Sequence, residues 1–318
     1  MNTSAWLDDI PEGRRIGSYT CGLPGPLILA VGGIHGNEPS GPRAIKAFLD
    51  MLHAQCPLMT GTVLGLLGNI KASAMNQRYL DKDLNRCFRS DYIAGADHQL
   101  LGAEGPELYE IAGILHRLRD EFEDVCFIDC HTTSAPTMPY LSMNAHPLSI
   151  QLAHRFPLNN VIGLQQSIPG CFAEYCNKLD FRGFTFEAGQ HVGAAAFNNQ
   201  MAILWLLLVY SGALHRRDLV NLRHYERMLS LDTPSLRRSF RLLSHYRITE
   251  GEDFVMQPGF SNFDYVQHGA TLACNRFGEI LSPADGYLLM PLYQKKGDDG
   301  FFLLEEESSL APRAAAMA

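Results

Sequence analysis

The chain has 318 residues, of which 46% are hydrophobic and 19% are charged, and its formal net charge at pH 7 is −8. These values suit a globular protein with a large core, long enough for one large domain and a smaller one. They argue against nucleic acid as a general partner, because no dense basic stripe is present to bind phosphates. A small acidic ligand is compatible with this charge, since it needs only a local cationic pocket.

Apolar, strand-like runs alternate with helical patterns along the first two-thirds of the chain. The apolar runs cover residues 27–31, 62–67, 125–128 and 183–186, and the helical patterns include 42–53 and 106–122. This alternation predicts an α/β fold, in which helices pack on a sheet and ligands gather at the carboxyl ends of the strands.

The first apolar run leads into the segment GIHGNE at residues 33–38. If a helix begins here, His35 and Glu38 lie three residues apart on one face and can reach the same metal ion. An imidazole with a carboxylate favours zinc over calcium or magnesium, which prefer oxygen ligands. The same pair also occurs as a hydrogen-bonded surface pair, so the prediction depends on a third ligand elsewhere.

The run at 125–128 supplies that third ligand, because it continues into Asp129, Cys130 and His131. A catalytic zinc needs three protein ligands and one open position, and His131 completes the set. Asp129 points to the same side of a strand as His131 and can orient its imidazole. Cys130 points to the opposite side and is expected to pack in the core. The alternative is a capping aspartate beside a histidine with a structural role.

Two further polar segments carry residues suited to hydrolysis. Asn85 and Arg86, with Arg78 eight residues before Arg86, offer donors that can hold a carboxylate. Glu187 ends the apolar run at 183–186, and a partly desolvated glutamate near a metal suits a general base. The alternatives are a solvated basic loop for the arginines, and a helix N-cap neighbour or a surface salt bridge for Glu187.

The sequence pattern changes in the second part of the chain. The apolar stretch 201–210 is shorter than the about 20 residues that cross a bilayer, so it predicts a buried helix and no membrane partner. Residues 219–244 read as a helix or linker, and short β-prone runs separated by turn residues follow from 246. We predict a domain at 1–217 and a mostly β domain at 218–318, with a frayed tail from 309.

The cysteines and the N-terminus bear on the compartment. None of the eight cysteines forms a Cys-x-x-Cys pair, which argues against a zinc knuckle. Residues 1–11 lack the basic-then-apolar pattern of a secretory signal. We therefore predict a cytoplasmic protein with mostly buried free thiols.

The segments GGIHGNE, RYLDKDLNRCF, DCHTTS and FTFEAGQH resemble, in this order, the succinylglutamate desuccinylase and aspartoacylase family. The resemblance covers nearly the whole chain and implies a three-layer, zinc-carboxypeptidase-like mixed sheet with helices on both faces. It also implies a C-terminal β-domain that caps the active site. By resemblance, the residues match one zinc ion per chain on His35, Glu38 and His131, a general base at Glu187, an oxyanion-stabilising arginine at Arg78, and a carboxylate-binding pair at Asn85 and Arg86.

Two departures from the family pattern concern the substrate. Aspartoacylases carry another substrate arginine about ten residues before the general base, and here only Lys178 or Arg182 could replace it. A late tyrosine of the aspartoacylase pocket falls near Phe301 or Phe302, which have no hydroxyl to donate. These differences leave the metal chemistry intact but weaken the case for N-acetylaspartate as the substrate.

The predicted function is a zinc-dependent hydrolase that cleaves the amide bond of a small acidic N-acyl amino acid. One alternative is a metallocarboxypeptidase that acts on short peptides. Another is a metal-binding relative without activity, although such a protein would need neither Glu187 nor Arg78. A homo-oligomer is compatible with the sequence, which does not fix the number of subunits.

Overall fold

The computed structural model describes residues 5–95, 101–134, 137–191, 194–230, 237–294 and 297–307. The strands are β1 (Arg15–Thr20), β2 (Leu27–Gly32), β3 (Thr62–Leu67), β4 (Val125–Thr133), β5 (Tyr140–Met143), β6 (Asn159–Ile162), β7 (Arg182–Gln190), β8 (Ser239–Arg247), β9 (Val255–Met256), β10 (Tyr265–Val266), β11 (Thr271–Asn275), β12 (Gly278–Leu281), β13 (Gly286–Leu289) and β14 (Asp299–Glu306). The α-helices are α1 (Ser40–Gln55), α2 (Ile70–Ala74), α3 (Ser90–Ala94), α4 (Glu104–Glu121), α5 (Pro147–Ala153), α6 (Phe172–Lys178), α7 (Ala194–Ser211) and α8 (Leu222–Leu229).

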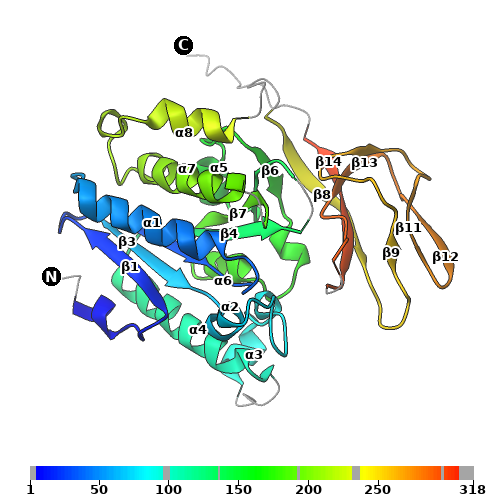
Figure 1. Ribbon diagram of the computed structural model, residues 1–318, viewed down its shortest axis with the longest axis horizontal. Coiled ribbons are helices and arrows are strands. Elements are labelled where there is room, and N and C mark those ends of the chain that lie inside the picture. The colour runs from blue at the N-terminus through cyan, green and yellow to red at the C-terminus, as the bar shows by residue number, and fades with distance from the viewer. Residues whose placement is uncertain are drawn as a thin grey trace, which may run out of the picture.

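Eleven strands form one mixed sheet in the order β1-β3-β2-β4-β7-β5-β6-β8-β14-β13-β10 (Figure 1). Its centre is parallel, with β2 between β3 and β4, and β7 beyond β4. The four strands predicted from apolar runs are confirmed, but β4 and β7 extend further than predicted, through His131 and Glu187. The backbone ladder continues through these polar positions and pairs the two residues in register.

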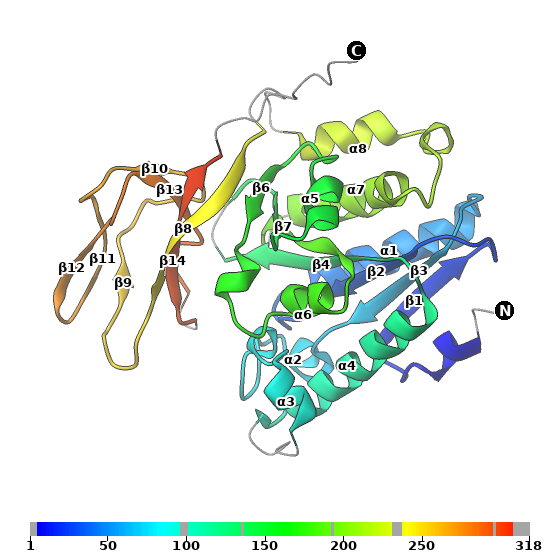
Figure 2. The same ribbon diagram turned by 180° about the vertical axis from the view of Figure 1, so that it is seen from behind.

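Helices cover both faces of the central strands (Figures 1 and 2). Helices α1, α5, α7 and α8 contribute to one hydrophobic core, and α4 and α6 contribute to the other. Along β2, Ile28 and Ala30 face the first core, and Leu27, Leu29 and Val31 face the second. A strand buried on both faces needs apolar residues at every position, which explains its unbroken apolar sequence. The predicted α/β fold with a mixed sheet and helices is thus confirmed.

The apolar stretch 201–210 lies within α7, as predicted for a buried helix. Seven consecutive residues of this helix, from Ala202 to Leu208, are almost inaccessible to solvent. Within the part of the chain that the structure describes, none of the helices has the length and apolar character required to cross a membrane.

The segment between β2 and α1 is a turn and not the start of a helix, because α1 begins only at Ser40. Within this turn, the Glu38 N–H donates to the His35 carbonyl at 3.1 Å. Gly33 has a φ of +77°, which a glycine adopts without strain, and it turns the chain out of β2. His35 and Glu38 therefore do not share a helix face, and the turn brings their side chains together instead.

Among the described residues after α8, the regular elements are all strands, and the described part of the segment 219–244 contains one helix, α8, and the start of β8. From Ser239 the chain forms β8, which pairs in parallel with β6 and continues the large sheet. Strands β14, β13 and β10 extend the same sheet, and β12, β11 and β9 form a second, three-stranded sheet. The domain boundary at 217/218 stays a prediction, and the predicted tail from 309 lies outside the described residues.

Candidate functional site

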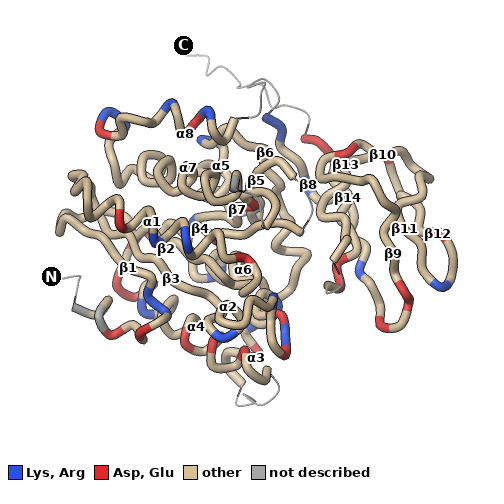
Figure 3. The backbone as a smooth tube through the Cα atoms, in the orientation of Figure 1, with Lys and Arg blue, Asp and Glu red and all other residues tan. Residues whose placement is uncertain are grey.

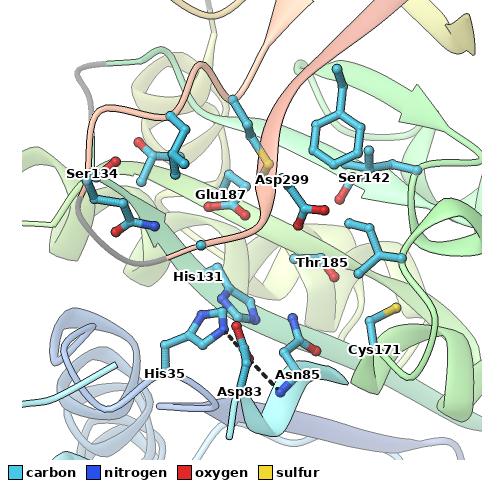
Figure 4. Close-up of a pocket in the computed structure, with 18 of the residues that line it drawn as sticks. His35, Asp83, Asn85, His131, Ser134, Ser142, Cys171, Thr185, Glu187 and Asp299 are labelled. Carbon is cyan, nitrogen blue, oxygen red and sulfur yellow. Dashed lines mark hydrogen bonds and ion pairs between the residues drawn. The ribbon is translucent and has the colours of Figure 1, made fainter. Parts of the chain in front are cut away.

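A pocket lies where β2, β4 and β7 end and where the C-terminal strands meet the rest of the chain. Its lining includes the predicted metal ligands, the predicted general base and the predicted polar residues of the arginine segment, namely His35, Glu38, Arg78, Asn85, Arg86, His131 and Glu187. The close-up in Figure 4 shows His35, His131 and Glu187 around the same space, with Asp299 entering from the C-terminal part. Ligand binding at the carboxyl ends of strands is the general rule for α/β sheets.

The three predicted metal ligands come together in the floor of this pocket. Possible ligand atoms of His35, Glu38 and His131 all lie within 4.8 Å of one another, and the three residues are buried. The Nδ1 atoms of His35 and His131 lie 2.9 and 3.4 Å from the two carboxylate oxygens of Glu38. Gly36 makes this turn possible, because a Cβ at this position would lie 2.2 Å from the backbone of Ala72.

An aspartate holds the second nitrogen of each imidazole. The Nε2 atom of His131 lies 2.9 Å from Asp129, and the Nε2 atom of His35 lies 3.1 Å from Asp83. Such carboxylate contacts fix the orientation of a metal-binding histidine. Asp129 was predicted for this role, whereas the contact of Asp83 was missed because nothing in the local sequence links it to His35, 48 residues earlier.

The charges of this cluster suit a divalent ion. Burial raises the pKa of Glu38, but the two imidazoles outweigh this effect and hold it well below its usual range. Burial lowers the pKa of His131, but Asp129 and Glu38 outweigh it and hold this pKa well above its usual range. Two imidazoles and a carboxylate are typical ligands of zinc, so the residues present fit the predicted ion.

Glu187 lies beside this cluster on β7, paired in register with His131 on β4. Burial raises the pKa of Glu187 to about 8; His131 opposes the rise, and Glu38 and Asp129 reinforce it. Its Oε2 atom has no hydrogen-bond partner among the described residues. A carboxyl group with a free oxygen and a pKa near neutrality can both accept and release a proton.

The two predicted arginines each face a carboxylate. Arg78 donates to Asp83 at 3.1 Å, and Arg86 forms an ion pair with Asp299 of β14. Both arginines keep a buried Nε atom without a hydrogen-bond partner among the described residues. Each can therefore still donate a hydrogen bond to a ligand.

The loop that carries these arginines is held by Glu104, which the sequence analysis did not identify. Its buried carboxylate accepts hydrogen bonds from the backbone N–H groups of Leu80, Asp81 and Lys82 at 2.8–3.1 Å. The side-chain oxygen of Asn85 accepts from the backbone N–H of Phe172, which leaves the amide NH₂ as the available donor. These contacts fix this loop, which includes the short 3₁₀-helix Leu84–Arg86, beside the metal-ligand cluster.

The proposed replacements for the missing substrate arginine are not in the pocket. Lys178 pairs with Glu174 at 2.8 Å, and Arg182 pairs with Asp124 at 2.7 Å. Arg182 begins β7, so it lies at the end of the strand opposite to the site. Of the two late phenylalanines, Phe302 lines the pocket and Phe301 packs in a separate core.

Comparisons with known proteins agree with this geometry. Residues 24–205 match the family described as succinylglutamate desuccinylase/aspartoacylase catalytic domain. A probable aspartoacylase of Nostoc sp. (strain PCC 7120 / SAG 25.82 / UTEX 2576) is 30% identical over 190 residues, which are 58% of this chain and 63% of that protein. An N-acyl-aromatic-L-amino acid amidohydrolase (carboxylate-forming) of Rattus norvegicus is 29% identical over 184 residues, 53% of this chain and 56% of that protein.

The matched regions are thus less than two-thirds of either relative. The crystal structure of the succinylglutamate desuccinylase of Chromobacterium violaceum has the same fold, with a TM-score of 0.66 at 15% identity over 96% of this chain and 97% of that one. The family match covers more than half of the chain and includes the metal-ligand cluster and Glu187. The chain belongs to the succinylglutamate desuccinylase/aspartoacylase family.

Proposed function

We propose that this protein is a zinc-dependent amidohydrolase that removes the acyl group from a small N-acyl amino acid. The observation that carries the proposal is the position of Glu187, a buried carboxyl group with a free oxygen beside the His35–Glu38–His131 cluster. Two relatives, a probable aspartoacylase and an N-acyl-aromatic-L-amino acid amidohydrolase, have names that support the same class of reaction.

Each group of residues in the pocket has a separate role in amide hydrolysis. When bound to His35, Glu38 and His131, zinc supplies Lewis acidity, which polarises the acyl carbonyl and makes water more acidic. Glu187 accepts a proton from the attacking water and returns it to the amine nitrogen as the carbon–nitrogen bond breaks. The products are the free carboxylic acid and the free amino acid.

The two arginines interact with two different negatively charged groups of the substrate. Arg78 contacts the floor of the pocket through Asp83, and its free Nε hydrogen can stabilise the negative oxygen that develops on the carbonyl. The free Nε hydrogen of Arg86 and the amide NH₂ of Asn85 can hold the substrate carboxylate. Fixing this carboxylate places the amide between the metal-ligand cluster and Glu187.

The C-terminal part also has a role in the proposed function. We propose that residues 218–318 act as a cap on a zinc-carboxypeptidase-like catalytic domain, and the contribution of Met290, Pro291 and Leu292 to the pocket supports this role. A cap favours small substrates over long peptides. The cytoplasmic location and the homo-oligomer remain predictions.

A panel assay tests the proposal. Zinc-loaded protein is incubated with N-acetyl and N-succinyl amino acids and with free and blocked dipeptides, and amine release is measured. We expect hydrolysis of N-acyl amino acids by the wild-type protein and rates about 10²–10⁴-fold lower with the Glu187→Gln variant. Release of a C-terminal amino acid from the dipeptides alone would indicate a carboxypeptidase, and stoichiometric zinc without any turnover would indicate a non-catalytic relative.

A further inference from the structure

The C-terminal part of the chain forms one wall of the pocket. This C-terminal wall consists of Asn262, Met290, Pro291, Leu292, Gln294, Gly297, Asp298, Asp299 and Phe302. Two of these nine residues are carboxylates; the Asp298 side chain is 56% exposed, whereas Asp299 is largely buried. A carboxylate as buried as Asp299 requires partners, since an unpaired buried charge is costly.

Asp299 has a partner on each oxygen. Its Oδ2 atom forms the ion pair with Arg86, and its Oδ1 atom lies 2.8 Å from Nε2 of His245 on β8. The His245 ring in turn stacks on Phe302, with the ring centroids 4.3 Å apart. Only 15% of the Asp299 side chain is exposed, so the carboxylate is held in a fixed position at the edge of the pocket.

This arrangement limits the positive charge that a substrate can meet. Among the described residues that line the pocket, the lysines and arginines are Arg78 and Arg86 only, and Asp83 and Asp299 already pair with them. Arg86 retains its Nε hydrogen, which suffices for one substrate carboxylate beside Asn85. A second carboxylate near Arg86 would face Asp299 at close range, and like charges in a desolvated site repel strongly.

We propose that Asp299 is a specificity-determining residue, which by pairing with Arg86 restricts the pocket to N-acyl amino acids that carry a single carboxylate. Neither the acyl group nor the amino-acid side chain then carries a carboxylate, and the apolar residues of the C-terminal wall can contact one of them. The inference rests on the proposed function and narrows its substrate class.

The test compares substrates that differ by one carboxylate. Three pairs are compared: N-acetylglutamate with N-acetylglutamine, N-acetylglutamate with N-acetylmethionine, and N-succinylvaline with N-butyrylvaline. The readout is the ratio of kcat/KM between the two members of each pair. We expect wild-type protein to prefer the single carboxylate by about tenfold or more, the factor that corresponds to 1.4 kcal/mol.

Three variants separate charge from structure. Asp299→Asn should shift the ratio toward the dicarboxylate by about tenfold or more, whereas Asp299→Glu, which keeps the charge, should keep the wild-type preference. Glu279→Gln on β12 is the charge-matched comparison in the C-terminal part. Its side chain is exposed and does not line the pocket, so solvent screening should make its effect much smaller.

Each outcome bears on the inference. A wild-type preference for dicarboxylates would overturn it, and so would an Asp299→Asn variant that slows both members of a pair equally, as expected for a structural role. If the Asp299 variants do not fold, the ratio of kcat/KM measured for the matched substrates with wild-type protein alone tests the inference. If no N-acyl amino acid is hydrolysed, the proposed function fails. The inference is then judged by calorimetric binding of the same pairs to zinc-loaded protein, where equal affinities would overturn it.

Discussion

The floor and the C-terminal wall of the pocket are built in different ways. The floor comes from the ends of neighbouring strands β2, β4 and β7, and its side chains are buried and linked by polar contacts. The wall comes from β14 and from loops of the C-terminal part, contains both apolar and polar residues, and contacts the rest of the pocket through the Arg86–Asp299 pair, whose members are 213 residues apart. Under the proposed function, the floor would carry the chemistry and the wall would select the substrate.

The distribution of charge in the backbone view is consistent with this division. Lys, Arg, Asp and Glu are mixed along the surface segments, and few of them lie on the apolar central strands (Figure 3). The charged residues of the floor are exceptions to this pattern, since Glu38, Asp129 and Glu187 are each at most 5% exposed. Buried carboxylates are costly unless they are paired or bind a metal, so their presence marks a functional region.

Removal of the metal should have the largest effect, because every catalytic step in the floor depends on it. Treatment with a chelator should abolish hydrolysis of all substrates, and added zinc should restore it. Metal content is measured by elemental analysis alongside activity. Full activity in protein with no stoichiometric transition metal would contradict the assignment of the floor.

Substitution of the general base comes next. Glu187→Gln should lower kcat by about 10²–10⁴-fold, because the amide cannot accept the proton from water. The variant should still bind zinc, since Glu187 is not one of the three ligands. Loss of zinc from this variant would instead make Glu187 part of the metal site.

The aspartates behind the histidines should have a moderate effect. Asp129→Asn and Asp83→Asn should each weaken zinc affinity or activity by about 10–100-fold, because an amide orients an imidazole less strongly than a carboxylate. Competition with a chromogenic chelator measures the affinity. The control is Asp50→Asn on α1, an exposed residue that pairs with Lys46 and should leave zinc affinity unchanged.

The smallest expected effect concerns how the wall is attached to the floor. Burial raises the pKa of Asp299, but His245 and Arg86 outweigh it and the pKa is lowered in the folded state. The resulting stabilisation is present above the ordinary aspartate pKa of about 3.9 and is lost as pH falls through the lowered value.

Urea unfolding at several pH values tests whether the stabilisation by Asp299 is lost as the pH falls. Wild-type protein should be roughly 1–3 kcal/mol more stable than Asp299→Asn at pH 7, the range for hydrogen bonds to charged groups. The difference should shrink as the pH falls below about 4. A difference that stays constant down to pH 3 would show that the ionised carboxylate is not its source.

The sequence by itself determined the central strands and the residues of the floor. Unbroken apolar runs predicted β2, β4 and β7 because strands buried on both faces need apolar residues throughout. Side chains at the ends of parallel strands meet at one edge of a sheet, so the convergence of His35, Glu38, His131 and Glu187 could be predicted. The sequence left open whether a helix begins at residues 33–38, since spacing alone does not separate a helix from a tight turn, and the structure has the turn.

Only the tertiary structure decided the partners of these residues. Asp83 reaches His35 across 48 residues, Glu104 holds the loop of the arginines, and Asp299 reaches Arg86 across 213. Lys178 and Arg182 were placed near the site by their distance along the chain, but they lie outside the pocket. Hydrophobic periodicity reports local structure and burial, whereas contacts between distant side chains depend on how the strands and loops pack in three dimensions.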